Sequence, residues 1–160
     1  MATRRQFLAF AAIAGVVVAG GAGGALLLPG DDSPGGLPKI RFGKEKCARC
    51  GMLIGDRRFA AAWRTASGDE KHFDDAGCMV LQASEAPPGD GALYWVSSYS
   101  DESLLEAASA TYVISPEIRS PMSYGVAAAA GPAEAESLAG RVNGQVASWQ
   151  DLPAILKERA

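Results

Sequence analysis

The densest group of metal-binding side chains in this sequence lies at residues 47–52, where the chain reads Cys-Ala-Arg-Cys-Gly-Met. Two residues separate Cys47 from Cys50, so a tight loop can turn both sulfurs toward one point. Gly51 lets the backbone fold closely around that point, because glycine tolerates conformations that other residues avoid. Met52 adds a thioether directly after the loop. The segment therefore predicts a site for a soft metal ion, since thiolate and thioether sulfurs prefer such ions.

Further sulfur and imidazole donors occur in two later segments. Cys78 and Met79 follow His72, the single histidine of the chain, and Met122 lies in a loop between a proline and a tyrosine. Met79 falls inside a predicted helix among apolar residues, which favours a place in the core, whereas the loop position of Met122 favours a functional role. Cys78 and His72 fit either a ligand or an ordinary structural role. The candidate metal ligands are the following: Cys47, Cys50, Met52, Met122, Cys78 and His72.

Three kinds of site are compatible with these donors. Thiolates combined with thioethers favour Cu(I), which is the interpretation we prefer. The three cysteines and His72 also make a complete Cys3His set, which is typical of structural Zn(II) and is the main alternative. A Cys-x-x-Cys pair can be a redox centre, but this chemistry favours a helix N-terminus at the first cysteine, and the glycines at 51 and 55 disfavour a helix there. A disulfide beside a buried thiol is the simplest structural interpretation.

Catalytic and nucleic-acid functions find little support in the residue types. The sequence contains no Ser-His-Asp set, phosphate-binding loop or paired glutamates, so we do not expect an enzyme. Asp74 and Asp75 lie where one of them would cap a helix. The net charge is −3, with no basic block after residue 5. Phosphate backbones require a clustered cationic face, so nucleic acid is not an expected partner.

An α+β fold must position the metal donors. The residue patterns predict strands at 59–66, 70–73, 93–96, 111–115, 125–130 and 145–148, and helices at 76–84, 131–139 and 151–159. Residues 101–108 are predicted as a short helix or helical turn. The order strand, strand, helix recurs along the chain, which predicts two small related ββαβ-type units packed together, at about 40–90 and 91–160.

The N-terminus predicts export from the cytoplasm. Arg4 and Arg5 precede the apolar residues 7–28, which are rich in alanine and glycine. This combination is typical of a twin-arginine signal, and about 22 residues at about 1.5 Å each would also span a bilayer of about 30 Å. The arginines should stay in the cytoplasm, which places the rest in the periplasm or on the outer face of the cytoplasmic membrane. The predicted parts are a signal or membrane-anchor helix at 1–28, a linker at 29–39 and a metal-binding domain at 40–160.

Three blocks of residues carry a resemblance to a known family. They are Cys-x-x-Cys-Gly-Met at 47–52, His-Phe-Asp-Asp-x-x-Cys-Met at 72–79, and Ser-Pro-Met followed by Gly-Val-Ala-Ala within 120–128. With these blocks in order, the sequence resembles NosL-type proteins over about residues 42–157. These are copper-binding accessory proteins of nitrous-oxide reductase maturation. The resemblance implies an extracytoplasmic Cu(I) carrier built from two small ββαβ halves.

The resemblance also implies partners and ligands. A carrier of this family delivers copper to a client cuproenzyme, expected here to be nitrous-oxide reductase, in concert with a membrane transporter complex. By the same resemblance, the metal role falls to these residues: Cys47, Cys50, Met52 and Met122. His72 and Cys78 are further candidates. Many members carry a lipid-bearing cysteine after the signal, which this chain lacks, so membrane contact would run through residues 7–28 if the signal is not cleaved.

Overall fold

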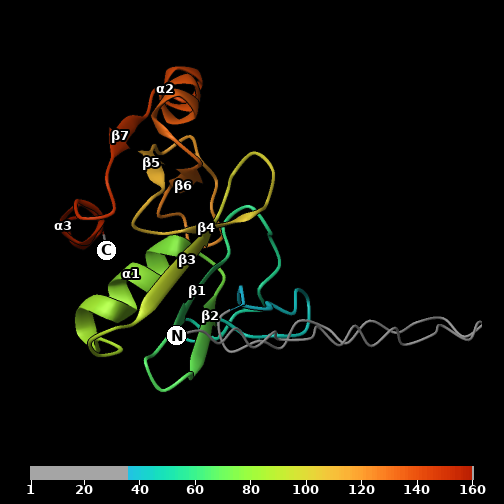
Figure 1. Cartoon of the computed structure of the whole chain (residues 1–160). Helices are drawn as coiled ribbons and strands as arrows, with labels where there is room; N and C mark the ends of the chain where they lie inside the picture. The colour runs from blue at the N-terminus through green and yellow to red at the C-terminus, as the bar shows by residue number, and fades with distance from the viewer. Residues whose placement is uncertain (1–35, 160) are drawn as a thin grey trace, which may run out of the picture. The chain divides into compact units, whose positions relative to one another are not determined.

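The computed structural model describes residues 36–159 (Figure 1). The predicted signal or anchor at 1–28 and most of the predicted linker lie outside the described residues. Within 36–159, no helix is both long and apolar enough to cross a bilayer. The elements in chain order are β1 (Ala61–Arg64), β2 (Glu70–Phe73), α1 (Ala76–Glu85), β3 (Leu93–Ser97), β4 (Leu104–Glu106), β5 (Thr111–Ile114), β6 (Val126–Ala129), α2 (Pro132–Arg141), β7 (Gln145–Ala147) and α3 (Leu152–Lys157).

The first half is an antiparallel sheet with the strand order β2-β1-β3-β4, and α1 packs against it. A turn joins β1 to β2, closed by the Thr65 N–H, which donates to the Asp69 carbonyl at 2.9 Å. α1 begins at Asp75, whose carboxylate accepts a hydrogen bond from the Gly77 N–H at 2.8 Å. The predicted helix cap is therefore confirmed and assigned to the second aspartate of the pair.

The second half is an antiparallel sheet with the order β6-β5-β7 and α2 on one face. Its strands β5 and β6 are buried on both faces. Tyr112 and Val126 belong to the core shared with the first half, whereas Val113 and Ala127 belong to a smaller core under α2. Because side chains alternate along a strand, small alanines in β6 can fill the narrow space between two layers.

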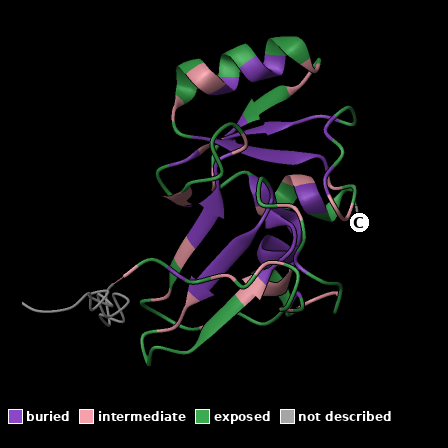
Figure 2. Ribbon diagram, turned by 90° about the vertical axis from the view of Figure 1, so that its right-hand side faces the viewer, coloured by how far each residue is buried: buried purple, intermediate pink, exposed green. Residues whose placement is uncertain are grey.

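The two halves repeat one topology. Each runs strand, strand, helix, strand, and in each the first strand lies between the second and third. The predicted α+β fold of two ββαβ units is therefore confirmed. β4 and α3 are additions to the repeat, and α3 packs against α1. As a result α1 is covered, while the outer side of α2, at the top of Figure 2, is exposed.

Two predicted features differ from the structure. Residues 101–108 do not form a helix, because β4 extends the first sheet as an edge strand, with Leu104 opposite Ser97. Pairing with β3 gives these backbone groups long-range partners, which a local pattern does not reveal. The predicted helix at 131–139 also ends too early. The helix continues to Arg141, and the following turn is closed by the Gly144 N–H, which donates to the Ala139 carbonyl at 2.9 Å.

Candidate metal centre

Three cysteine sulfurs converge where the Cys-x-x-Cys loop meets α1. The Sγ atoms of Cys47, Cys50 and Cys78 all lie within 4.8 Å of one another, and all three are free thiols. Cys47 and Cys78 are buried, whereas Cys50 is partly exposed. Sulfurs that share one metal ion at about 2.3 Å lie about 4 Å apart. A small rearrangement would therefore close this cluster around a single ion.

A tight loop positions the first two cysteines. The Gly51 N–H donates to the Cys47 carbonyl at 3.0 Å, and the Cys47 N–H donates to the Met52 carbonyl at 2.8 Å. Gly51 has φ of 76°, in the left-handed region that glycine adopts without strain. Lys46 and Leu53 then form an antiparallel bridge, so the loop closes a short two-stranded ribbon. No helix starts at this loop, as the glycines predicted.

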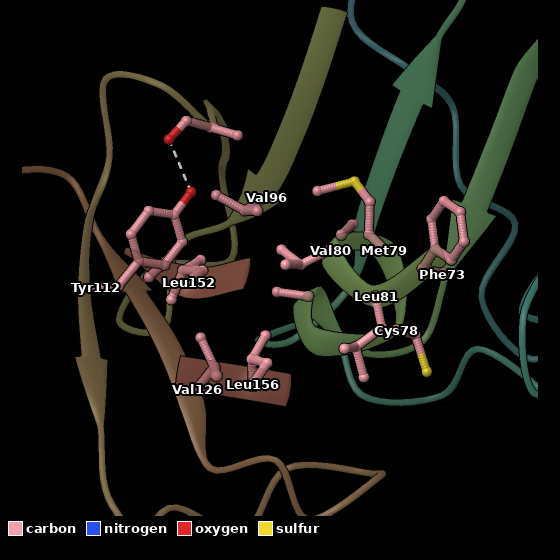
Figure 3. Packing of buried hydrophobic residues seen from close by; sticks show 14 of the residues in the cluster. Phe73, Cys78, Met79, Val80, Leu81, Val96, Tyr112, Val126, Leu152 and Leu156 are labelled. Carbon is pink, nitrogen blue, oxygen red and sulfur yellow. Dashed lines mark hydrogen bonds between the residues drawn. The ribbon is translucent and has the colours of Figure 1, made fainter. Parts of the chain in front are cut away.

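The third sulfur comes from the first turn of α1. Cys78 lies three residues after the cap Asp75 and is fully buried. The helix start is tightly packed, because a Cβ added at Gly77 would lie 2.4 Å from the Tyr124 ring. Figure 3 shows the side chains of Cys78 and Met79 leaving α1 in different directions. Met79 is part of the hydrophobic core, as predicted.

The three thiols differ in acidity. The Cys78 thiol donates a hydrogen bond to the Cys47 sulfur, which lowers the pKa of Cys47 to about 4. Backbone N–H groups of Cys50, Asp74 and Arg49 stabilise the same thiolate. Burial raises the pKa of Cys50, while the hydrogen bond to Cys47 and burial both raise the pKa of Cys78. At neutral pH the cluster therefore holds one thiolate and two thiols. An ion bound by all three sulfurs would displace two protons, because the thiolate is the ligand form.

The second half of the molecule brings the Met122 loop to the start of α1. The Asp75 carboxylate accepts a hydrogen bond from the Met122 N–H at 3.2 Å, and the Ser120 hydroxyl donates to it as well. Met122 is partly buried and packs against the core that includes Cys47 and Cys78. A methionine distant in sequence is thus tied to the cap of the helix that carries the third cysteine.

Arg49, inside the Cys-x-x-Cys loop, connects this loop to both halves. Its guanidinium forms a two-point ion pair with Glu85 at 2.6 and 2.8 Å, and it also donates to the Tyr124 hydroxyl. Glu85 ends α1, and Tyr124 belongs to the second half. Neither these contacts nor the bond from Asp75 to the Met122 loop could be predicted from the residue pattern. No local signal in the sequence could have found them, because the Arg49–Glu85 pair spans 36 positions and the Asp75–Met122 bond spans 47.

Met52 and His72, two further predicted donors, have different surroundings. Met52 is 49% exposed at the end of the loop. The His72 ring is held by two carboxylates, with Nδ1 at 2.9 Å from Glu45 Oε2 and Nε2 at 3.2 Å from Glu70 Oε2. Among the His, Cys, Asp and Glu side chains of residues 36–159, the cluster of potential ligands contains the cysteines alone, so the Cys3His set is not assembled. Metal ligation by any of the six candidate residues stays a prediction.

Comparison with known proteins points to one family. The NosL family model matches residues 41–156. No curated protein matches the chain significantly. Among solved structures, the chain is similar to the copper chaperone NosL from Shewanella denitrificans, with a TM-score of 0.59 and 17% sequence identity, over 72% of this chain and 94% of that chain. At this identity the similarity establishes a shared fold that spans nearly the whole solved chain.

Proposed function

Because the chain belongs to the NosL family, we propose that it is an extracytoplasmic Cu(I) carrier that hands copper to a cuproenzyme. The observation that carries this proposal is the cluster of three free thiols, one of which is already poised as a thiolate. Copper is the cargo of this site. The solved relative of the same fold is described as a copper chaperone, which supports the proposal.

The donor chemistry favours Cu(I) over Zn(II). Sulfur ligands suit a soft monovalent ion, and Cu(I) is satisfied by two or three of them. A structural zinc site normally closes with four ligands. The imidazole that would complete such a site belongs to His72, and Glu45 and Glu70 engage both of its ring nitrogens. Freeing this ring would break its contacts with both carboxylates before any bond to a metal could form.

The charge of the site supports a mixed thiolate and thioether set. Each added thiolate places another negative charge in a partly buried environment, and unpaired charge there is expensive. A thioether supplies a soft donor without adding charge. We propose that Cys47, Cys50 and Cys78 are the thiol ligands and that Met122 or Met52 supplies the neutral sulfur.

The different exposure of the sulfurs suggests how cargo is exchanged. The Cys47 and Cys78 sulfurs are shielded from solvent, which protects the ion and the thiols from oxidation. Cys50 and Met52 lie at the surface and are the donors that an incoming receiver can displace first. Loss of the surface donors would leave the ion on two buried sulfurs, from which a receiver can take it by ligand exchange.

The biological setting completes the proposal. We propose that the protein is non-catalytic, that residues 1–28 export it or anchor it outside the cytoplasm, and that the receiving pathway is a membrane transporter complex that serves nitrous-oxide reductase. Family membership and the absence of a catalytic set in the sequence support this assignment. The residues from 40 onward form the copper-binding domain, preceded by a linker at 29–39.

Competition with metal chelators tests the proposal. The full chain should hold Cu(I) against a Cu(I) chelator and release Zn(II) readily to a zinc chelator. Cys47→Ser, Cys50→Ser and Cys78→Ser should each weaken Cu(I) binding, whereas Met79→Leu, a sulfur change in the core next to Cys78, should leave it unchanged. Tight zinc binding with negligible Cu(I) binding would contradict the proposal. Turnover of a disulfide substrate with a thiol reductant would instead identify a redox protein.

A further inference from the structure

The charged residues of the described chain are distributed unevenly. Residues 36–64 contain eight Lys and Arg against two Asp and Glu, a net charge of +6. Residues 65–159 contain five Lys and Arg against 14 Asp and Glu, a net charge of −9 with His neutral. The chain has no continuous basic run in either part, so this contrast is visible only when the two stretches are compared. The positive stretch contains the Cys-x-x-Cys loop.

The ribbon that closes the candidate metal centre carries part of this positive charge at its surface. We call residues 43–47 and 52–54 the metal-site ribbon, because the Lys46–Leu53 bridge pairs them. Cys47 and Ile54 are buried on its inner side. The exposed side chains of the ribbon are Lys44, Lys46, Met52 and Leu53.

The two acidic residues of this stretch leave that surface positive. Glu45 is partly buried, and its Oε2 lies 2.9 Å from the His72 Nδ1. Asp56 pairs with Arg58 at 2.6 Å. Among the described residues, neither lysine of the metal-site ribbon forms an ion pair.

Apolar surface accompanies this positive charge. Met52 is 49% exposed and Leu53 is 55% exposed, and both follow directly on the Cys-x-x-Cys loop. Leu53 lies opposite Lys46 in the ribbon, so an exposed apolar side chain and a lysine share one face. Interfaces that form and dissociate combine an apolar centre with a polar rim, and this face has that composition. The partly exposed Cys50 precedes Met52 and Leu53, in the adjoining Cys-x-x-Cys loop.

We propose that the exposed face of the metal-site ribbon is the docking surface for an acidic receiver protein that takes copper from the site. This inference rests on the proposed function and names the chemistry of the partner. Charges on separate molecules act over about 10 Å at 0.1 M salt. An acidic receiver is attracted to Lys44 and Lys46 and repelled by the negative remainder of the domain. Encounter is therefore steered to the face where Cys50 and Met52 are accessible.

A transfer experiment with two peptide probes tests this surface. Both probes carry the same Met-x-x-Met receiver sequence, flanked by glutamates in one and by lysines in the other. The full chain in non-ionic detergent, loaded with Cu(I), should transfer copper to the acidic probe about tenfold faster at low salt, and the difference should shrink as salt rises. Equal rates for the two probes would overturn the proposal.

Matched charge reversals localise the effect. Lys44→Glu combined with Lys46→Glu should abolish the preference for the acidic probe. Arg141→Glu combined with Lys157→Glu makes the same change in net charge at two exposed positions of the second half and should retain the preference. An equal loss in both variants would assign the preference to net charge and overturn the docking surface. All four positions are exposed, so thermal unfolding should confirm that both variants fold.

Two other occupants of this surface give different results. The first is anionic lipid. In that case the chain would bind phosphatidylglycerol vesicles better than phosphatidylcholine vesicles, the lysine double variant would lose this binding, and copper transfer would show no preference between the probes. The second is the acidic part of another copy of this chain. In that case the metal-free chain would sediment as a dimer and the lysine double variant would sediment as a monomer. Either result would overturn the proposal.

The affinity for copper separates this inference from the proposed function. If chelator competition shows no Cu(I) binding, the proposed function is wrong. Docking can then still be tested with the metal-free chain, by the fluorescence anisotropy of the labelled acidic probe. Binding that the lysine double variant abolishes would still support the surface. If Cu(I) binds tightly and transfer shows no preference for the acidic probe, the proposed function stands and the proposed docking surface is wrong.

Discussion

The two ββαβ halves share a strand order but begin their helices in different ways. α1 starts at Asp75, whose buried carboxylate caps the helix, and Cys78 lies three residues later. α2 starts at Gly131, which offers no side-chain cap, and Glu134 lies three residues later. The Glu134 carboxylate is partly exposed and accepts a hydrogen bond from the Ala130 N–H at 3.0 Å. Equivalent positions thus hold a buried thiol in one half and a backbone-binding carboxylate in the other.

The two helix starts differ because other parts of the chain bury them to different extents. The start of α1 lies beneath the Met122 loop, and residues 76–81 are all buried. The start of α2 is less covered: its Glu134 carboxylate accepts a hydrogen bond from the Ser100 hydroxyl but stays partly exposed, and three residues of the helix are buried. A polar group beneath a cover must find its partners inside the protein, whereas an exposed one can use water. Among the described residues, the repeated fold therefore assembles the cluster of three cysteine sulfurs where the helix start lies between the halves.

Removal of the buried cap should have the largest effect on stability. Asp75→Ala leaves the Gly77 and Met122 N–H groups and the Ser120 hydroxyl without their acceptor. Loss of a cap and of buried acceptors should together lower the free energy of unfolding by about 3 kcal/mol. Urea denaturation measures this change. The counterpart Glu134→Ala should lower it by less than about 1 kcal/mol, and equal losses would break the contrast between the helix starts.

A larger side chain in the tight contact beneath the Met122 loop should have the second-largest effect on stability. Gly77→Ala places a Cβ 2.4 Å from the Tyr124 ring, so the ring or the helix must move. Overpacking of this kind should destabilise the protein by about 2 kcal/mol, measured in the same denaturation experiment. An unchanged unfolding midpoint would show that the contact between the halves is loose.

The contribution of the second half to metal binding is tested by Met122→Leu. This change keeps an apolar side chain of similar volume and removes the thioether. Cu(I) affinity should fall about tenfold, which corresponds to about 1.4 kcal/mol, while stability changes little. Chelator competition measures the affinity, and Met79→Leu is the matched control in the core. If both variants bind Cu(I) like the wild type, the second half provides cover but no ligand.

The smallest effect is expected in the exposed helix. Gly140 lies inside α2, and a Cβ added there meets no atom within 4 Å. Gly140→Ala should therefore stabilise the protein by about 0.5–1 kcal/mol, because alanine loses less conformational freedom in a helix. The same substitution at Gly77 in α1 should change the free energy of unfolding in the opposite direction, so the two variants together distinguish the two helices. Destabilisation at Gly140 would show that α2 is more closely covered than its exposure indicates.

Most of the fold could be predicted because its signals are local. The turn after β1, the aspartate before α1 and the proline at the start of α2 each act within a few residues. β4 was not predicted, because its three residues become a strand only by pairing with β3. The end of α2 was misplaced since Gly140 keeps a helical backbone and does not cap the helix.

At the site, residue types and spacing were enough to predict the kinds of donor and the geometry of the Cys-x-x-Cys loop. A two-residue spacing followed by glycine constrains the backbone locally, so Cys47 and Cys50 were certain to be neighbours. Only the tertiary structure decided that Cys78 joins them and that His72 pairs with two glutamates instead. It likewise tied the Met122 loop to Asp75, across 47 positions of the chain. The physical reason is that such contacts depend on how helix α1 packs between two sheets, and residue types and spacing do not encode that packing locally.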